Sequence, residues 1–229
     1  MTTGGTPVAG EAGKRAAAAR GAAEVAAGQI IGLGSGSTVD LLVQAIGHRV
    51  RGEGLAVVAV AASLATEHAA RAAGIEVRDL NEVAALDLAL DGADEVDPQG
   101  RLLKGGGGAL LREKLVALAA RRLLILVDER KLVAALGARM PLPVEVVPFA
   151  WRHTAARLAG LGLAPALRGG QDDPYRTDNG NLILDCRGAF ADLGPAIKTV
   201  PGVVEHGIFA GFRPQVVVGR EDGSTVVRG

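Results

Sequence analysis

Between residues 11 and 135, short apolar runs alternate with longer stretches in which apolar and polar residues are mixed. Short apolar runs predict buried strands, and longer stretches that are rich in Ala or have an apolar face predict helices. The predicted strands are residues 29–33, 55–60, 75–77, 86–90 and 123–127, and the predicted helices are residues 11–27, 39–50, 63–73 and 108–120. Strands that alternate with helices are typical of right-handed βαβ units, so this part of the chain predicts an α/β fold with a parallel sheet.

The pattern changes near residues 140–143, Met-Pro-Leu-Pro. Beyond them the predicted order is strand, helix, strand, strand, helix, strand, over residues 144–147, 151–161, 163–167, 182–184, 190–197 and 203–209. An Asn-Gly pair within residues 177–181 predicts a turn before the third of these strands, because Asn and Gly readily adopt positive φ. These elements predict a small α+β domain inserted into the first domain.

Both ends of the chain bear on the domain organisation. Residues 216–218 and 224–227 predict a hairpin that returns to the main sheet. We therefore expect one domain made of residues 1–138 and 207–229, and a second made of residues 139–206. Residues 1–10, which are small and polar, are expected to be a disordered leader.

Composition narrows the classes of partner. The chain has 229 residues, of which 48% are hydrophobic, enough for one large and one small domain with a sizeable core. Lys plus Arg and Asp plus Glu both number 25, so the zero net charge does not favour binding to nucleic acid or to an anionic membrane. Only 3% of the residues are aromatic, which disfavours base stacking.

Location is inferred from cysteine use and from the lack of targeting signals. The single cysteine, Cys186, cannot form an internal disulfide, which fits a reducing compartment. No apolar run reaches the length of a membrane span, and the N-terminal residues lack a signal-peptide core. We expect a cytoplasmic protein with neither a membrane nor a nucleic-acid partner.

Three loops with unusual polar content each follow a predicted strand. They are residues 34–38, 91–97 and 128–131. A parallel sheet places the carboxyl ends of its strands at one edge, where open α/β sheets bind ligands. Lys104 and the four glycines at 105–108 are tethered close to the second loop. This convergence predicts a functional site at that edge.

The first loop, Gly34-Ser-Gly-Ser-Thr38, has the features of a phosphate site. Its glycines let backbone N–H groups face an anion, its hydroxyls add donors, and the next helix contributes its positive end. No Lys follows where a P-loop requires one, and a dinucleotide-binding pattern starting at Gly32 would need glycine at Ser37. A plain strand-to-helix turn remains the alternative.

The acidic loop that begins at Asp91 is compatible with three roles. Its acids could contact a substrate, cap a helix or turn, or bind a divalent metal with help from Glu95 and Asp97. Consecutive acids point in different directions, and Lys104 would compete with a metal for the same space. Substrate contact through Asp91 and Asp94 is therefore the favoured interpretation.

Lys104 and Glu113 are candidates for chemistry. Lys104 and the glycines after it can stabilise an oxyanion, whereas the alternative is a surface lysine before a flexible loop. Glu113 lies in an apolar helical stretch and has no charged neighbour three or four positions away. Turned toward the cleft it would be desolvated and could act as a general base, and the alternative is an exposed surface carboxylate.

The histidines and Cys186 give no comparable signal. The four histidines lack metal-ligand spacing, Cys186 has no partner motif, and no Gly-x-Ser-x-Gly elbow is present. We expect these residues to be structural or superficial.

Taken together and in order, six motifs resemble ribose-5-phosphate isomerases of the A type, from about Lys14 to the end of the chain. The motifs are Gly34-Ser-Gly-Ser-Thr38, Asp91-Gly-Ala-Asp-Glu95, Lys104-Gly-Gly-Gly-Gly108 with Arg112-Glu113-Lys114, Pro141-Leu-Pro-Val-Glu-Val146, Thr177-Asp-Asn-Gly-Asn181 and Pro201-Gly-Val-Val204. The resemblance implies a Rossmann-like domain with a smaller α+β, ferredoxin-like domain, assembled as a homodimer or homotetramer. It also implies interconversion of D-ribose 5-phosphate and D-ribulose 5-phosphate in the non-oxidative pentose phosphate pathway, without metal or organic cofactor.

The same resemblance implies roles for individual residues. Glu113 would be the general base that moves a proton between C2 and C1 through a cis-enediolate. Asp91 and Asp94 would contact substrate hydroxyls and assist ring opening, and Lys104 with the backbone of the glycines after it would stabilise the enediolate oxygen. The other implied substrate-binding residues are Lys14, Ser35, Gly36, Ser37, Thr38, Gly92, Ala93, Gly105, Gly106, Gly107 and Lys131. Ser35 and Gly108 depart from the family pattern, where Thr and Ala are common.

Other functions fit parts of this pattern. A sugar-phosphate sensor is one, although it would not require the full set of acids, lysine and glutamate, and the chain shows no DNA-binding extension. A metal-dependent enzyme that uses the acids at 91–97 is another. A nicotinamide enzyme fits less well because the glycine pattern is broken.

Overall fold

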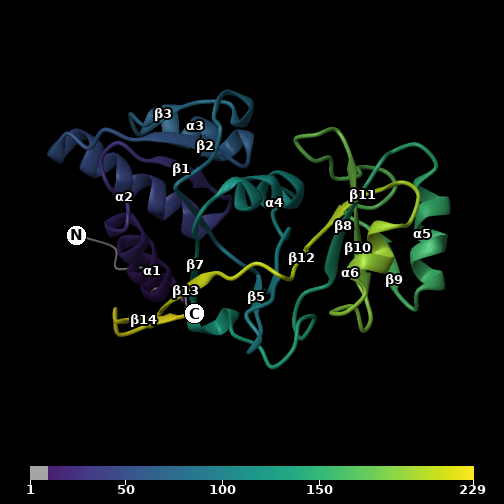
Figure 1. The fold of residues 1–229 in the computed structure, drawn as a ribbon. Helices are drawn as coiled ribbons and strands as arrows, with labels where there is room; N and C mark the ends of the chain where they lie inside the picture. Colours follow the sequence, from purple (N-terminus) through teal and green to yellow (C-terminus); the bar gives the residue numbers. More distant parts are fainter. Residues whose placement is uncertain (1–9) are drawn as a thin grey trace, which may run out of the picture.

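A seven-stranded sheet forms the centre of the larger unit in the computed structural model, which describes residues 10–229 (Figure 1). The order of its strands is β14-β13-β7-β4-β1-β2-β3, and only the β13–β14 pair is antiparallel. The strands are β1 (Ile30–Leu33), β2 (Val58–Ala61), β3 (Glu76–Val77), β4 (Leu88–Asp91), β7 (Leu123–Asp128), β13 (Gln215–Gly219) and β14 (Thr225–Arg228). The predicted α/β class and the returning hairpin are confirmed. The predicted leader, up to residue 9, lies outside the described residues.

Helices cover both faces of this sheet. They are α1 (Glu11–Ala23), α2 (Ser37–Glu53), α3 (Leu64–Ala72) and α4 (Leu110–Ala119), with short 3₁₀ turns η1 (Leu80–Glu82) and η2 (Glu129–Lys131). Neighbouring residues of β4 point to opposite faces. Leu90 packs with Ala17 of α1 and Ile46 of α2, whereas Ala89 packs with Val116 of α4. No helix within residues 10–229 is long and apolar enough to cross a membrane.

Helix boundaries follow local signals where the sequence carries them. Helix α3 begins at the predicted serine cap, because Ser63 Oγ accepts the N–H of Thr66 at 3.1 Å. Helix α1 ends at Ala23, earlier than the predicted residue 27, and the chain then turns toward β1. Ala content alone marks a helix but not its end.

A separate sheet of four antiparallel strands forms a second unit, here called the four-stranded unit (residues 142–206). Its strands are β8 (Leu142–Val146), β9 (Ala164–Leu167), β10 (Leu182–Arg187) and β11 (Val203–His206), and its helices are α5 (Trp151–Gly160) and α6 (Gly194–Lys198). The order β11-β8-β10-β9 is that of the predicted ferredoxin-like arrangement. The domain boundaries at residues 139 and 206 stay a prediction.

The predicted strand over residues 203–209 is wrong, because the structure divides it between two sheets. Strand β11 pairs with β8, whereas β12 (Ile208–Phe209) pairs with β6 (Leu102–Leu103), which also pairs with β5 (Glu95–Val96). The break falls at Gly207, whose carbonyl accepts the N–H of Lys104 at 2.9 Å. A Cβ at Gly207 would lie 2.1 Å from the Lys104 carbonyl oxygen, so only glycine fits this crossing. The crossing between the sheets thus fixes the backbone of Lys104.

Helix α1 meets the end of β13 at a pair of glycines. A Cβ on Gly219 would lie 1.9 Å from the carbonyl oxygen of Gly13, and a Cβ on Gly13 would lie 2.7 Å from that of Gly219. Neither residue has a positive φ, so what the two glycines provide is space. Lys14 follows Gly13 directly, and the close backbone approach therefore sets how deeply Lys14 reaches into the edge of the sheet.

We expect Gly219→Ala to lower the free energy of unfolding by about 1–3 kcal/mol, the usual cost of overpacking, because the new methyl meets backbone rather than a movable side chain. Thermal denaturation measures the change. Gly52→Ala in α2 is the matched control, since a Cβ there meets nothing within 4 Å. Equal melting temperatures for the two variants would contradict this account of the glycine pair.

Candidate active site

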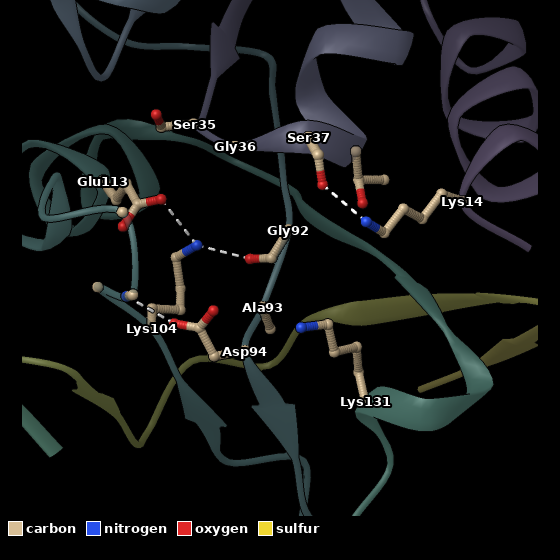
Figure 2. A pocket seen from close by; sticks show the side chains of 14 residues that line it. Lys14, Ser35, Gly36, Ser37, Gly92, Ala93, Asp94, Lys104, Glu113 and Lys131 are labelled. Atoms are coloured by element: carbon tan, nitrogen blue, oxygen red, sulfur yellow. Dashed lines mark hydrogen bonds and ion pairs between the residues drawn. The ribbon is translucent and has the colours of Figure 1, made fainter. Parts of the chain in front are cut away.

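One pocket lies at the edge of the seven-stranded sheet where β1, β4 and β7 end, and these three strands are neighbours (Figure 2). The loops after these strands meet there, as expected for a parallel sheet. The residues that line it are Lys14, Ser35, Gly36, Ser37, Thr38, Gly92, Ala93, Asp94, Lys104, Gly105, Gly106, Gly107, Glu113 and Lys131. All of them belong to the set expected from the sequence.

One side of the pocket is suited to an anion. Ser37 is the first residue of α2, and Gly36 before it has φ of 103°, a conformation that favours glycine. The first N–H groups of α2 therefore point toward the pocket end of the helix. Lys14 Nζ donates to Ser37 Oγ at 2.9 Å, and Lys131 at the end of η2 lines the same side (Figure 2). Two ammonium groups and a helix N-terminus together fit a phosphate.

The opposite side is organised around the buried ammonium of Lys104. Its Nζ lies 3.0 Å from Asp91 Oδ2, 3.0 Å from Glu113 Oε1 and 2.6 Å from the Gly92 carbonyl oxygen. A lysine has three N–H donors, so these contacts use all of them. Burial disfavours the charge of Lys104, but the two carboxylates outweigh it and raise the pKa above its ordinary value. Lys104 therefore stays positively charged.

The site shifts the pKa of Glu113 into the range that suits proton transfer near neutral pH. It lies in the first turn of α4 and is buried, and its Oε2 has no hydrogen-bond partner within residues 10–229. Burial raises the pKa of Glu113 from 4.5 to about 8, the charge of Asp91 adds to this, and Lys104 opposes it. A carboxylate with a pKa near neutrality and a free oxygen at the pocket wall can both take up and return a proton.

Asp91 lies behind the pocket wall rather than in it. Its Oδ1 accepts the N–H groups of Gly92 at 2.7 Å and Ser35 at 3.3 Å, and its Oδ2 faces Lys104. Gly34 makes this possible, because a Cβ there would lie 1.8 Å from Asp91 Oδ1. Asp91 thus joins the loop of residues 34–38 to the buried lysine, a position that the sequence pattern did not reveal.

The remaining acids of the loop divide into two groups. Asp94 lines the pocket and accepts the Gly106 N–H at 2.7 Å. Glu95 instead accepts backbone N–H groups of residues 137, 139 and 140, and Asp97 accepts those of residues 99 and 101 together with the Arg101 side chain. Glu95 and Asp97 therefore hold turns of the backbone, whereas Asp94 lines the pocket.

These contacts bear on the metal hypothesis. Glu95 and Asp97, the further ligands that such a metal would need, are occupied by protein donors. Within the part of the chain that the structure describes, no group of three or more His, Cys, Asp or Glu side chains is arranged to hold a metal ion. Cys186 is buried, which raises the pKa of its thiol to about 12, and so behaves as a structural residue.

Some contacts of the site have no local signal in the sequence. Ser63 Oγ lies 3.1 Å from Ser35 Oγ, so the cap of α3 also supports the loop of residues 34–38. Lys114 points away from Glu113, and its buried Nζ donates to Glu205 Oε1 at 2.8 Å and to the carbonyl groups of His206 and Ile208. Arg168 and Tyr175 contact the glycine loop from the four-stranded unit. Except for the Ser63 contact, each of these contacts joins the site to the four-stranded unit or to the segment that follows it.

The sequence is similar to those of curated isomerases. Residues 58–223 match the family described as ribose 5-phosphate isomerase A (phosphoriboisomerase A). The chain is 54% identical over 219 residues to ribose-5-phosphate isomerase A of Thermomicrobium roseum, which covers 93% of this chain and 92% of that protein. It is 43% identical over 221 residues to the Methanothermobacter thermautotrophicus protein of the same name, which covers 94% of this chain and 97% of that one.

Solved structures agree with the sequence matches. The ribose 5-phosphate isomerase A of Methanocaldococcus jannaschii superimposes with a TM-score of 0.87 at 38% identity, covering 94% of this chain and 98% of that one. A D-ribose-5-phosphate isomerase in complex with phospho-erythronic acid gives a TM-score of 0.90 at 36% identity, covering 96% and 100%. The resemblance seen in the motifs is confirmed, and the chain belongs to the ribose 5-phosphate isomerase A family.

Proposed function

We propose that this protein interconverts D-ribose 5-phosphate and D-ribulose 5-phosphate through a cis-enediolate, with Glu113 as the general base. The observation that carries the proposal is the Lys104 ammonium, 3.0 Å from both Asp91 and Glu113, beside a pocket that holds two further lysines. An aldose–ketose isomerisation needs one base, one stabiliser of negative charge and an anchor that fixes the reacting carbons. Family membership supports the same substrate pair.

The phosphate of the substrate would bind between Lys14, Lys131 and the N-terminus of α2. These groups lie on the side of the pocket away from Glu113 (Figure 2). Binding energy at the phosphate would then position C1 and C2 without touching them, which is how a remote group contributes to transition-state stabilisation. Thr38 and the loop glycines would complete this anchor.

The chemical step moves one proton between carbons. In the open-chain aldose, Glu113 removes the proton from C2, the C–H electron pair forms the C1–C2 double bond, and the C1 carbonyl electrons move to O1. Protonated Glu113 then returns the proton to C1, while the hydroxyl proton on O2 moves to O1 and the C2 carbonyl forms. The same sequence in reverse converts the ketose to the aldose.

Lys104 keeps the charge balanced during this step. Before proton transfer its ammonium faces the carboxylates of Asp91 and Glu113. When Glu113 is protonated, the negative charge moves to the enediolate, which weakens the contact between Lys104 and Glu113. The Lys104 ammonium can then turn toward the developing oxyanion, where a preorganised charge lowers the barrier.

Asp94 would contact substrate hydroxyls, and its place in the pocket lining beside the glycine loop supports this role. Ring opening assisted by Asp94 and Asp91 stays a prediction. For Asp91, the position behind the wall favours an additional role through Lys104. Since every step uses side chains of the chain itself, we expect turnover to be unchanged by EDTA.

The family resemblance also supports three wider proposals. The enzyme would act in the non-oxidative branch of the pentose phosphate pathway, in the cytoplasm, and as a homodimer or homotetramer. Size-exclusion chromatography with light scattering tests the assembly.

Glu113→Gln is expected to fold normally and to lower the turnover of ribose 5-phosphate by about 10²–10⁴-fold, the usual contribution of a general base. The amide keeps the shape of the side chain but cannot accept the proton. Turnover is measured by the formation of ribulose 5-phosphate, and Glu53→Gln at the surface is the control. Near-normal activity of the Glu113 variant would falsify the assignment.

The pH dependence follows from the pKa of Glu113. Because the base must be ionised, kcat/KM for ribose 5-phosphate should rise with pH and level off above an apparent pKa of about 8. Stability should show the opposite trend. A carboxyl group whose pKa is raised on folding favours the folded state at low pH, and this contribution is lost as pH rises through 8.

Wild type should therefore lose stability relative to Glu113→Gln between pH 5 and pH 9, as measured by thermal denaturation in matched buffers. A kcat/KM profile that is flat from pH 6 to pH 9 would rule out a base with this pKa.

A further inference from the structure

The glycine loop at the pocket is held from behind by side chains of the four-stranded unit. Arg168 Nη1 donates to the carbonyl oxygens of Gly105 and Gly106, at 3.0 Å each. The hydroxyl of Tyr175 donates to the carbonyl oxygen of Gly107 at 2.9 Å. Three successive carbonyl groups of a loop without side chains are thus fixed by two residues.

Arg168 is itself rigidly held. Its Nε and Nη2 donate to the two carboxylate oxygens of Asp185, at 2.9 Å and 2.5 Å. Asp185 lies within β10, and the N–H of Arg168 donates to the carbonyl of Ile183 on the same strand. The guanidinium lies 5.6 Å from the ring centroid of Tyr175, and only 17% of the Arg168 side chain is exposed. A bidentate pair of this kind fixes orientation as well as position.

The direction of the carbonyl groups determines the direction of the N–H groups. In a trans peptide the C=O and the N–H of one plane point in opposite directions. Arg168 holds the Gly105 carbonyl, and the N–H of the same plane, on Gly106, donates to Asp94 at 2.7 Å. Arg168 also holds the Gly106 carbonyl, so the N–H of Gly107 must point to the pocket side. Gly107 lines the pocket.

The Gly107 N–H is important because all three N–H groups of Lys104 are already engaged before proton transfer. They are taken by Asp91, Glu113 and the carbonyl of Gly92. The Gly107 N–H, by contrast, makes no hydrogen bond among the residues that the structure describes. It is a neutral donor that is available from the start of the reaction.

We propose that Arg168, oriented by Asp185, is a positioning residue that aims the Gly107 N–H at the enediolate oxygen. Tyr175 assists it at the next carbonyl. The inference rests on the proposed isomerase reaction and adds a contribution from the four-stranded unit. Arg168 touches no reacting atom, so its effect on rate passes through the glycine loop.

Arg168→Met tests the proposal. We expect kcat for ribose 5-phosphate to fall about 10–100-fold, somewhat less than the 10²–10³ that follows removal of an oxyanion donor, because the N–H is misaligned rather than deleted. KM should change less than about threefold, since the phosphate anchor is untouched. Two competitive inhibitors distinguish the phosphate anchor from the glycine loop. They are inorganic phosphate and phospho-erythronic acid, which a related isomerase binds.

The inhibition constant of phospho-erythronic acid should rise about tenfold or more, because its carboxylate presents a second anion to the glycine loop. The inhibition constant of inorganic phosphate should stay within about twofold of wild type, since it reports only the anchor. A general loss of structure would raise both constants together, and that result would overturn the proposal. So would a kcat within about twofold of wild type.

Matched variants complete the design. Arg152→Met removes an arginine of α5 whose guanidinium contacts Gln171 at the surface, and it should leave all four constants unchanged. Tyr175→Phe keeps the ring beside Arg168 and removes one hydrogen bond, so kcat should fall about 3–10-fold at constant phosphate inhibition. If Arg168→Met does not fold, Tyr175→Phe becomes the test of the proposal, and a wild-type kcat for Tyr175→Phe would overturn it.

Failure of this inference can be told apart from failure of the proposed function. If wild type does not convert ribose 5-phosphate, the proposed function is wrong. If wild type is active and Arg168→Met is equally active, the isomerase assignment stands and only the role of Arg168 is wrong.

Discussion

The buried contact of one ammonium with two carboxylates is the interaction on which the site depends. Lys104, Asp91 and Glu113 come from the β6 end, the end of β4 and the first turn of α4. Removing Lys104 would leave two buried carboxylates without a cation, which is costly, whereas neutralising Glu113 leaves Lys104 paired with Asp91. Burial raises the pKa of Glu113 toward neutrality, and the second carboxylate, Asp91, raises it further, so Glu113 can hold a proton near neutral pH. The buried carboxylates of this cluster lower the stability of the fold at neutral pH, and the same burial gives Glu113 the pKa that proton transfer needs.

The backbone around this contact is arranged so that groups from distant segments can approach it. Gly34 leaves room for Asp91, and Gly207 lets the chain pass beside Lys104. Gly13 and Gly219 together bring Lys14 to the side of the pocket that suits an anion. In each case a missing Cβ allows main chain or a carboxylate to come closer than any side chain would permit. The many glycines of this sequence therefore include several that the site needs, beyond those in its obvious glycine loop.

The sequence allowed the sheet, the four-stranded unit and the loops of the pocket to be predicted, because each depends on a local pattern or on the geometry of parallel strands. The division at Gly207 could not be predicted, since residues 203–209 fit a single strand and only the strands they pair with differ. The sequence also did not show that Asp91 lies behind the wall while Asp94 lines it. Arg168 and Tyr175 were missed because their contacts cross between the two units, far apart in sequence.

The place of β13 in the sheet has a consequence for biosynthesis. Strand β7 is apolar and pairs with β4 on one side and with β13 on the other, yet the whole four-stranded unit is translated between β7 and β13. A nascent chain therefore carries β7 with one open edge until β13 emerges, and open apolar edges recruit other chains. Synthesis of β13 thus both closes this edge and, through Gly219, seats the helix that carries Lys14. Assembly of the anion site and protection from aggregation are completed in the same late event.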